Sequence, residues 1–415
     1  MAASRPDALS SRLDPPPDWL TRADTAAVMA ALSAAGGEDA TRFVGGCVRD
    51  TLAGHKVEDI DIATRLTPDA VVAALDAAGL KSVATGVEHG TVTAIVSGRP
   101  FEITTLRRDV ETDGRRAVVA FTRDWAEDAQ RRDFRLNAIY ADRSGALFDP
   151  TGEGVADALA GRIVFVGDAA MRVREDYLRI LRFFRFFAWY GEGAPDAAAL
   201  AACAALKNGL ASLAAERITK ELLKLLAAPD PRSAVRLMAQ TGVLAAILPK
   251  ADDLAAFEAM VALSPDPLLR LAALAPRDAA DTAGALRLSN AQRDRLIAAT
   301  AADIAPMDSR AARAALYADG AQTIADRARL AWAAGRGVET DWAPVLALAE
   351  DWSRPVLPVK GADAVEAGIA PGPAMGAALR AVAAWWVDED FAPDRAAVLR
   401  KLRELARQPT GLRAP

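Results

Sequence analysis

The chain has 415 residues, of which 52% are hydrophobic and 25% charged, and its formal net charge is −5. This length exceeds one ordinary hydrophobic core, so we expect two to four folded domains and exclude an intrinsically disordered chain. The two cysteines, Cys47 and Cys203, exclude a disulfide framework or a cysteine-rich zinc site and favour a reducing cytoplasm. Because the chain has no apolar leader core and no run of about 18 uncharged apolar residues, we expect no membrane-spanning helix.

The first 150 residues alternate short apolar runs with helical patterns, which predicts an α/β or α+β domain. Residues 42–44 are typical of a short strand that ends at Gly45-Gly46, and residues 48–52 are typical of the helix that follows. Residues 58–63 alternate acidic and apolar side chains, as a half-buried strand does.

The next segments belong to the same domain. Thr67 and Pro68 fit the N-cap and the first position of a helix. Residues 91–96 and 101–106 fit two strands joined around Ser97-Gly98.

From Asp168 onward the chain has the pattern of successive helices. Two of them are expected at residues 174–190 and 214–226, and helical segments continue to residue 407. The predicted breaks contain prolines, and they lie at 229–231, 265–267 and 355–358. The sequence therefore predicts a small mixed domain followed by a helical region.

Two glycines and two aspartates form the first group with a chemical pattern. Gly45 and Gly46 let the backbone approach a ligand closely and turn its amides towards phosphate oxygens, and Arg49 adds a charged group one turn later. Asp59 and Asp61 are two residues apart, so on a strand both point to one face at a spacing of roughly 6–7 Å. Such a pair needs a cation, and Mg²⁺ is the natural one because it takes oxygen ligands and retains substrate phosphates.

Glu102, in the predicted strand 101–106, is a candidate third carboxylate. With Asp59 and Asp61 it would complete a two-metal site for in-line phosphoryl transfer. The alternative is a solvated edge strand for the Asp-x-Asp pair and an ordinary surface charge for Glu102. The glycine motif at this spacing from the aspartates favours the metal site.

Residues 130–138, Gln-Arg-Arg-Asp-Phe-Arg-Leu-Asn-Ala, are expected to form a short helical stretch. On a helix Asp133 and Asn137 are four residues apart and share a face. Arg132 can bind phosphate, and Asp133 with Asn137 can hold a ribose hydroxyl or brace the metal site. The alternative is a charge cluster at a helix N-terminus.

A ridge of charged residues is predicted on the helix at 174–190. Asp176, Arg179, Arg182 and Arg185 recur every three residues and lie along one side of a helix. The alternative for this pattern is a helix with ion pairs between neighbouring turns.

The first two residues of the ridge match the edge of a base. Cytosine and adenine each offer an amino donor beside a ring-nitrogen acceptor, so Asp176 can accept from the amine while Arg179 donates to the ring. Guanine and uracil place a carbonyl where the amine should be, which costs about 1–3 kcal/mol for the unsatisfied group. One pair can therefore select C and A.

Together these segments resemble the class II CCA-adding enzymes and the closely similar bacterial poly(A) polymerases. The resemblance is carried by Gly45-Gly46-Cys47-Val48-Arg49-Asp50, Asp59-Ile60-Asp61, residues 86–93 and 101–107, Arg131-Arg132-Asp133-Phe134 with Asn137-Ala138, Asp149-Pro150, residues 166–168, Glu175-Asp176-Tyr177-Leu178-Arg179 with Arg182 and Arg185, and residues 216–224. It covers residues 43–249. Tyr177 departs from the pattern, because a smaller residue is common there.

The resemblance implies an α+β nucleotidyltransferase head, similar to polymerase β, followed by an all-α neck, body and tail. The expected divisions are an N-terminal extension at 1–26, a catalytic head at 27–150, a neck for base recognition at 151–212, a helical body at 213–330 and a helical tail at 331–415.

It also implies Mg²⁺-dependent addition of CCA to the 3′ end of tRNA from CTP and ATP, in the cytoplasm. By carry-over, Asp59 and Asp61 hold the metal and act with Glu102 in catalysis. The nucleotide would be bound by Gly45, Gly46, Arg49, Arg132, Asp133, Asn137, Asp176, Arg179, Arg182 and Arg185. The sequence indicates no oligomeric state.

Two alternatives stay open. One is a bacterial poly(A) polymerase, although residues 87–92 resemble the CCA-adding pattern more closely. Residues 108–121 also resemble a flexible loop that is associated in this family with adding the terminal A. The other alternative is a catalytically silent RNA-binding protein, against which the intact aspartate pair argues.

Contacts with RNA are expected from the helical region. The candidates share a basic side chain and are Arg217, Lys220, Lys224, Arg232 and Arg236, although a solvated face explains them as well. Both histidines, His55 and His89, are interpreted as structural residues.

Overall fold

The computed structural model describes residues 12–86, 90–113, 116–251, 254–275 and 277–407. The chain divides into two compact units, residues 1–252 and 253–415, and each has its own architecture. Within the described ranges we find no helix with the length and apolar character that a membrane span needs. His89 lies outside the described residues.

A seven-stranded mixed sheet forms the centre of the first unit. Its strands are β1 (Thr41–Val44), β2 (Ile60–Thr64), β3 (Lys81–Gly86), β4 (Thr91–Val96), β5 (Arg99–Thr105), β8 (Tyr140–Ala141) and β9 (Leu147–Phe148). They lie in the order β3-β4-β5-β2-β1-β8-β9, with β2 and β5 parallel and the other neighbours antiparallel. The register of β2 with β5 places Asp61 directly beside Glu102.

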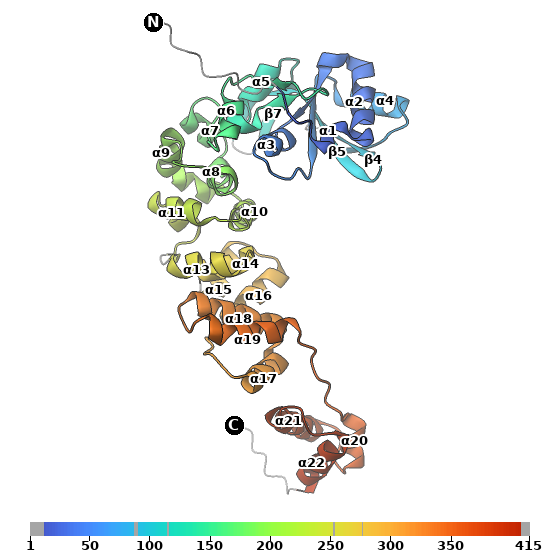
Figure 1. Ribbon diagram of the computed structural model, residues 1–415, viewed down its shortest axis with the longest axis vertical. Coiled ribbons are helices and arrows are strands. Elements are labelled where there is room, and N and C mark those ends of the chain that lie inside the picture. The colour runs from blue at the N-terminus through green and yellow to red at the C-terminus, as the bar shows by residue number, and fades with distance from the viewer. Residues whose placement is uncertain (1–11, 87–89, 114–115, 252–253, 276, 408–415) are drawn as a thin grey trace. The chain divides into compact units, whose positions relative to one another are not determined.

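Short helices surround this sheet. They are α1 (Asp18–Thr21), α2 (Ala23–Gly36), α3 (Gly46–Leu52), α4 (Pro68–Ala77), α5 (Trp125–Gln130) and α6 (Gly154–Leu159), with the 3₁₀ turns η1 (Glu38–Ala40) and η3 (Arg135–Asn137). Helices α2 and α4 lie side by side against the sheet (Figure 1). The predicted N-cap of α4 is confirmed, because the Ala70 amide donates to Thr67 Oγ1 at 3.4 Å. The predicted turn at Ser97-Gly98 is confirmed by φ values of 52° and 78°.

The segment expected to be a loop, 108–121, was predicted wrongly. It forms a two-stranded antiparallel ribbon of β6 (Arg107–Asp113) and β7 (Arg116–Phe121), separate from the main sheet. The loop was expected from the resemblance to the family. Val118 and Val119, which are β-branched and favour strands, were the opposing signal.

The expected helix at 130–138 is also wrong. Helix α5 ends at Gln130, and the backbone is extended at Phe134, with φ −121° and ψ 147°, before η3 begins. Phe134 is fully buried and bridges to Phe165, and the Asp133 side chain accepts from the Phe134 amide. This local hydrogen bond and the burial of Phe134 override the helix. Asp133 and Asn137 nevertheless meet, as described below.

The remaining helices of the first unit are α7 (Ala169–Glu175), α8 (Leu178–Tyr190), α9 (Ala197–Leu206), α10 (Ala215–Leu226), α11 (Arg232–Gln240) and α12 (Val243–Ile247), with the 3₁₀ segment η4 (Lys207–Ser212). The single helix expected at 174–190 is therefore two helices. The chain is extended at Asp176, whose Oδ1 accepts from the Leu178 amide at 3.1 Å. An aspartate that bonds its own neighbouring backbone competes with helix formation, which explains the break.

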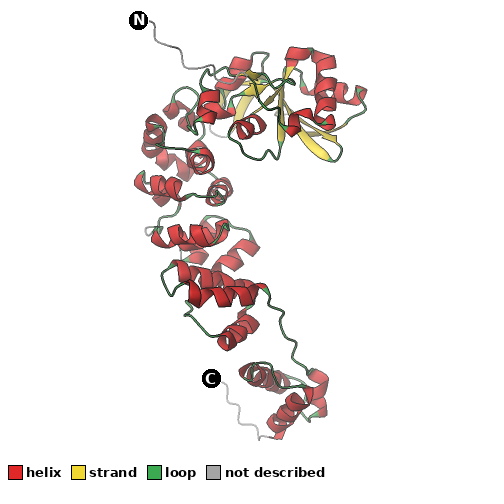
Figure 2. Cartoon of the chain, viewed as in Figure 1, coloured by secondary structure: helices red, strands yellow, loops and turns green. Residues whose placement is uncertain are grey.

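The second unit is helical throughout its described residues (Figure 2). Its helices are α13 (Ala255–Leu263), α14 (Pro267–Leu274), α15 (Ala279–Ala285), α16 (Asn290–Thr300), α17 (Ser309–Asp319), α18 (Ala321–Ala333), α19 (Glu339–Glu350), α20 (Gly361–Glu366), α21 (Pro373–Asp388) and α22 (Arg395–Arg407). Trp342 and Trp386 are central to two of its buried clusters. The predicted fold class, an α+β region followed by helices, is confirmed.

Gly209 is expected to be intolerant of substitution because the ring of Tyr177 packs against it. A Cβ atom at this position would lie 2.1 Å from Tyr177 Cδ1. We expect Gly209→Ala to lower the free energy of unfolding by about 1–3 kcal/mol, measured by urea denaturation. The control is Gly284→Ala on α15, where a Cβ meets no atom within 4 Å and no loss is expected. Equal stability of the two variants would contradict this packing.

Candidate active site

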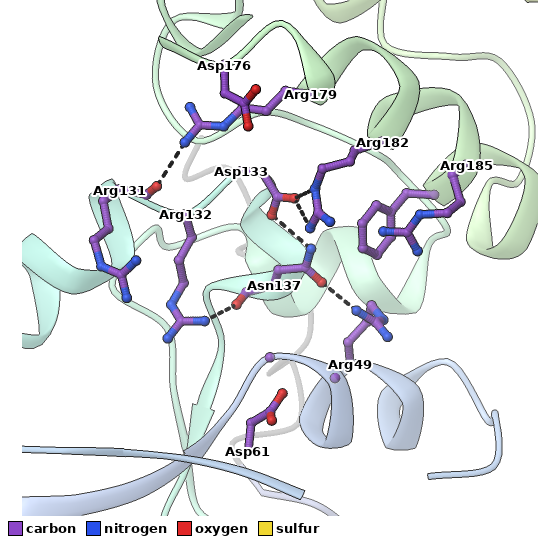
Figure 3. Close-up of a pocket in the computed structure, with 13 residues that line it drawn as sticks. Arg49, Asp61, Arg131, Arg132, Asp133, Asn137, Asp176, Arg179, Arg182 and Arg185 are labelled. Carbon is purple, nitrogen blue, oxygen red and sulfur yellow. Dashed lines mark hydrogen bonds and ion pairs between the residues drawn. The ribbon is translucent and has the colours of Figure 1, made fainter. Parts of the chain in front are cut away.

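A polar pocket of about 470 Å³ lies in the first unit (Figure 3). It is lined by Gly45, Gly46, Arg49, Asp61, Arg131, Arg132, Asp133, Asn137, Asp176, Arg179, Arg182, Arg185 and Phe186. The pocket is lined by every residue that the sequence predicted for catalysis or nucleotide binding, except Asp59 and Glu102. Six arginines face three aspartates, so the cavity carries an excess of positive charge that suits an anionic ligand.

The turn between β1 and α3 forms one wall of the pocket. Gly45 has φ 70° and ψ −119°, a conformation that residues with a Cβ rarely adopt. A Cβ on Gly45 would lie 3.7 Å from Arg132 Nη1, and one on Gly46 would lie 3.9 Å from Asp61 Oδ2. The two glycines therefore keep the space between an arginine and an aspartate open to a ligand.

The three predicted carboxylates differ in position. Asp61 is half-buried on β2 and lines the pocket, whereas Asp59 is exposed and lies one residue before that strand. Glu102 is exposed on β5 beside Asp61. Burial, together with the negative charge of Glu102, raises the pKa of Asp61 to about 6. A cation at this place would relieve that repulsion.

Among the described residues, no three Asp, Glu, His or Cys side chains are arranged to hold a metal ion. The side chains present fit an ion that takes one or two carboxylates and completes its shell with water and phosphate oxygens. Mg²⁺ has this preference, whereas a metal that needs a full cage of protein ligands does not fit.

A buried aspartate holds Arg132 in position. Asp128, on α5, is 1% exposed and accepts from Arg132 Nη2 at 3.0 Å, from Arg131 Nε at 2.9 Å and from Tyr140 Oη at 2.7 Å. Burial alone would raise the pKa of Asp128, but the two arginines hold it down to about 2. Asp128 therefore stays ionised and keeps both guanidinium groups at the pocket wall.

The amide group of Asn137 connects Arg49 on α3 with Asp133 (Figure 3). Its Oδ1 accepts from Arg49 Nη1 at 2.7 Å, and its Nδ2 donates to Asp133 Oδ1 at 2.9 Å. Asp133 in turn accepts from Arg182 Nε at 2.7 Å. Burial alone would raise the pKa of Asp133, but the positive charge of Arg182 lowers it below its usual value. The chain of contacts links α3, the segment 131–137 and α8.

Asp176 and Arg179 lie at the start of α8 and bond to different partners. Asp176 Oδ2 accepts from Arg217 Nη2 at 2.8 Å. Arg179 Nη1 donates to Glu175 Oε2 at 2.5 Å, and its Nη2 donates to the Arg131 carbonyl at 3.3 Å. The two side chains both line the pocket without pairing with each other, so both can meet a ligand.

Arg185 is held by Glu221, a buried residue of α10. Its Nε donates to Glu221 Oε2 at 2.5 Å, and Arg182 Nη1 lies 3.7 Å from Glu221 Oε1. The ridge of arginines on α8 is confirmed, with Asp176 just outside the helix.

Sequence reasoning missed the carboxylates that hold these arginines, namely Asp128, Glu175 and Glu221. Asp128 stands three and four residues before Arg131 and Arg132, and Glu175 stands four before Arg179, so helical spacing was a usable signal for both. Glu221 stands 36 residues from Arg185, and no local pattern connects them.

Two family models match the chain. The model of the poly A polymerase head domain matches residues 41–164, and the model described as probable RNA and SrmB-binding site of polymerase A matches residues 195–254. The mouse protein CCA tRNA nucleotidyltransferase 1, mitochondrial, is 41% identical over 244 residues, which are 56% of this chain and 55% of that protein. The CCA-adding enzyme of Geobacillus stearothermophilus is 41% identical over 207 residues, 48% of this chain and 49% of that enzyme. The chain spans about half the length of these relatives.

Solved structures extend the similarity over most of the chain. The Bacillus stearothermophilus CCA-adding enzyme in complex with CTP has a TM-score of 0.74 and 28% identity, covering 92% of this chain and 98% of that one. The Thermotoga maritima CCA-adding enzyme complexed with tRNA has a TM-score of 0.60 and 18% identity, covering 88% and 90%, which shows a shared fold.

Asp128 is expected to contribute stability in a pH-dependent way. Its pKa of about 2 in the folded protein is below the value of about 3.9 in an unfolded chain, so its contribution is present above about pH 4 and is lost as the pH falls towards 2. We expect Asp128→Asn to lower the free energy of unfolding by about 2–3 kcal/mol at pH 7, and by less below pH 4. Urea denaturation at both pH values measures this, and a difference that does not change with pH would contradict it.

Proposed function

We propose that the chain is a CCA-adding enzyme of the tRNA nucleotidyltransferase and poly(A) polymerase family, which extends the 3′ end of tRNA with CTP and ATP. One observation carries this proposal. A single cavity contains a glycine turn and an aspartate suited to a metal-bound triphosphate. It also contains Asp176, just before α8, and Arg179 on α8, which are suited to a base edge.

Asp61, with Asp59 two residues before it, would hold Mg²⁺. Mg²⁺ held there would supply charge neutralisation for the phosphate oxygens and would lower the pKa of the attacking 3′ hydroxyl, in an in-line transfer that releases pyrophosphate. No histidine lines the pocket, so a histidine general base has no support among the described residues. Glu102, directly beside Asp61, is proposed to increase the negative charge that attracts the ion.

The guanidinium groups of Arg49, Arg132 and Arg185 are proposed to bind the triphosphate. A guanidinium group is always charged, and its N–H groups form strong hydrogen bonds with phosphate oxygens. Gly46 allows the phosphates to approach the backbone, and Asp133 with Asn137 is proposed to orient the ribose. These roles would place the reacting phosphorus near Asp61.

Asp176 and Arg179 are proposed to read the base. Asp176 accepts one hydrogen bond on each oxygen in the absence of nucleotide, and each carboxylate oxygen has a second lone pair for the amine of C or A. Arg179 would donate to the ring nitrogen beside that amine. A carbonyl in place of the amine would face the carboxylate, which costs about 1–3 kcal/mol and rejects G and U.

We also propose the domain boundaries expected from the sequence, with the head at 27–150, the neck at 151–212, the body at 213–330 and the tail at 331–415. The reducing cytoplasm is the proposed compartment, because Cys47 and Cys203 are both free and buried. Arg217 already bonds Asp176, so of the basic residues suggested for RNA contact it is proposed to support base reading instead.

The reaction product tests this function against poly(A) synthesis. Purified protein is incubated with a tRNA transcript that lacks its CCA end and with CTP, ATP or both, and the products are resolved at single-nucleotide length. We expect two additions with CTP alone and three with both nucleotides. A long tail made from ATP alone would identify a poly(A) polymerase, and no extension at all would favour a silent RNA-binding protein.

Asp61→Asn is expected to separate activity from stability. Incorporation should fall by at least about 10³-fold, since the metal loses a carboxylate ligand. The pKa of about 6 for Asp61 lies above the unfolded value of about 3.9, so ionised Asp61 destabilises the metal-free fold as the pH rises through this range. At pH 8 without Mg²⁺ the variant should therefore be more stable than the wild type by about 2 kcal/mol.

The control for this variant is Asp69→Asn, which alters an exposed aspartate on α4 and should change neither quantity. Incorporation assays and thermal unfolding with and without Mg²⁺ measure both effects. Full incorporation by Asp61→Asn would refute the metal-site assignment.

A further inference from the structure

Tyr190, the last residue of α8, lies outside the pocket lining and has no part in the chemistry above. Its hydroxyl nevertheless accepts a hydrogen bond from Arg49 Nη2 at 2.9 Å. The Arg49 guanidinium carbon also lies 4.5 Å from the centroid of the Tyr190 ring, within range of a cation–π interaction. One tyrosine therefore contacts the same arginine through both its hydroxyl and its ring.

The ring of Tyr190 is itself fixed by two other rings. His55, which follows α3, stacks on it with centroids 4.9 Å apart and an interplanar angle of 27°. Phe186, one turn earlier on α8, stacks on it at 5.7 Å and 29°. Phe186 lines the pocket and lies 5.1 Å from the Arg49 guanidinium. Tyr190 is therefore held by the head segment around α3 and by its own helix.

The other hydrogen bonds of Arg49 explain why this contact matters. Nε donates to Asp50 Oδ1 at 2.8 Å, and Nη1 donates to Asn137 Oδ1 at 2.7 Å. The side chain is only 12% exposed. Of these hydrogen-bond partners, Tyr190 is the one that lies on α8, so its hydroxyl connects the guanidinium directly to the base-reading helix.

We propose that Tyr190 is a positioning residue that holds Arg49 against α8 and thereby keeps the phosphate-binding turn in register with the base-reading residues. This inference rests on the proposed function. Because Tyr190 acts through a phosphate-binding arginine, loss of its hydroxyl should weaken the binding of CTP and the binding of ATP by the same factor. A change to Asp176, which acts on the base edge, should in addition relax the rejection of UTP and GTP, whereas loss of Tyr190 should leave that rejection unchanged.

Tyr190→Phe tests the inference, since it removes the hydroxyl and keeps the ring. Dissociation constants for CTP and ATP are measured by calorimetry in the presence of Mg²⁺ without tRNA. We expect both to rise by about tenfold, by factors that agree within twofold. Tyr317→Phe is the matched control, because Tyr317 also contacts an arginine, Arg354 at 4.7 Å, but lies in the second unit. It should change neither constant.

A double-mutant cycle separates positioning from a general structural effect. In an Arg49→Ala background, Tyr190→Phe should cause no further loss of affinity, because the group through which it acts is gone. Equal losses with and without Arg49 would overturn the proposal, as would affinity within twofold of the wild type for Tyr190→Phe alone. If the wild type binds nucleotides but adds neither C nor A to tRNA, the proposed function fails, while the cycle still decides the role of Tyr190.

Discussion

The pairing of arginines with buried carboxylates is the interaction on which the pocket depends. Six guanidinium groups around one cavity repel each other, and a buried arginine without a partner costs several kcal/mol. Asp128 holds Arg131 and Arg132, Asp133 holds Arg182, and Glu221 holds Arg185. Since these carboxylates come from α5, the segment after it and α10, the pocket depends on the packing of all three segments around α8.

The same pairing divides the acidic residues into two kinds. Asp128 and Asp133 have their pKa values lowered by arginines, so both remain ionised. Asp61 has its pKa raised to about 6 by burial and by Glu102, so it is the pocket carboxylate that gains most from a cation. This contrast supports a metal role for Asp61 and a scaffold role for Asp128. The same contrast predicts that the pocket binds the metal and the triphosphate more tightly together than either one alone.

Local patterns in the sequence predicted the local parts of the structure. The strand, glycine turn and helix at 42–52 and the cap at Thr67 depend on neighbouring residues alone, and both are confirmed. The helix expected through Asp176 failed because the aspartate bonds the backbone two residues later. The helix expected at 130–138 failed because burial of Phe134 outweighed its local pattern.

Contacts between distant segments were beyond such patterns. Arg49 and Tyr190 are separated by 141 positions, and Arg185 and Glu221 by 36. Helical periodicity predicted that Arg182 and Arg185 share a ridge, but it carried no information on which carboxylate faces them. The resemblance to a known family predicted that the pocket residues form one site. The carboxylates that hold the arginines became evident only from the packing.

A structure of the protein with CTP and Mg²⁺ tests the central claim most directly. We expect the cytosine amine to lie within hydrogen-bond distance of Asp176, the triphosphate to contact Arg49 and Arg132, and the metal to contact Asp61. A cytosine bound away from Asp176 and Arg179, or a metal with no contact to Asp61, would contradict the assignment of this pocket as the site of nucleotide addition.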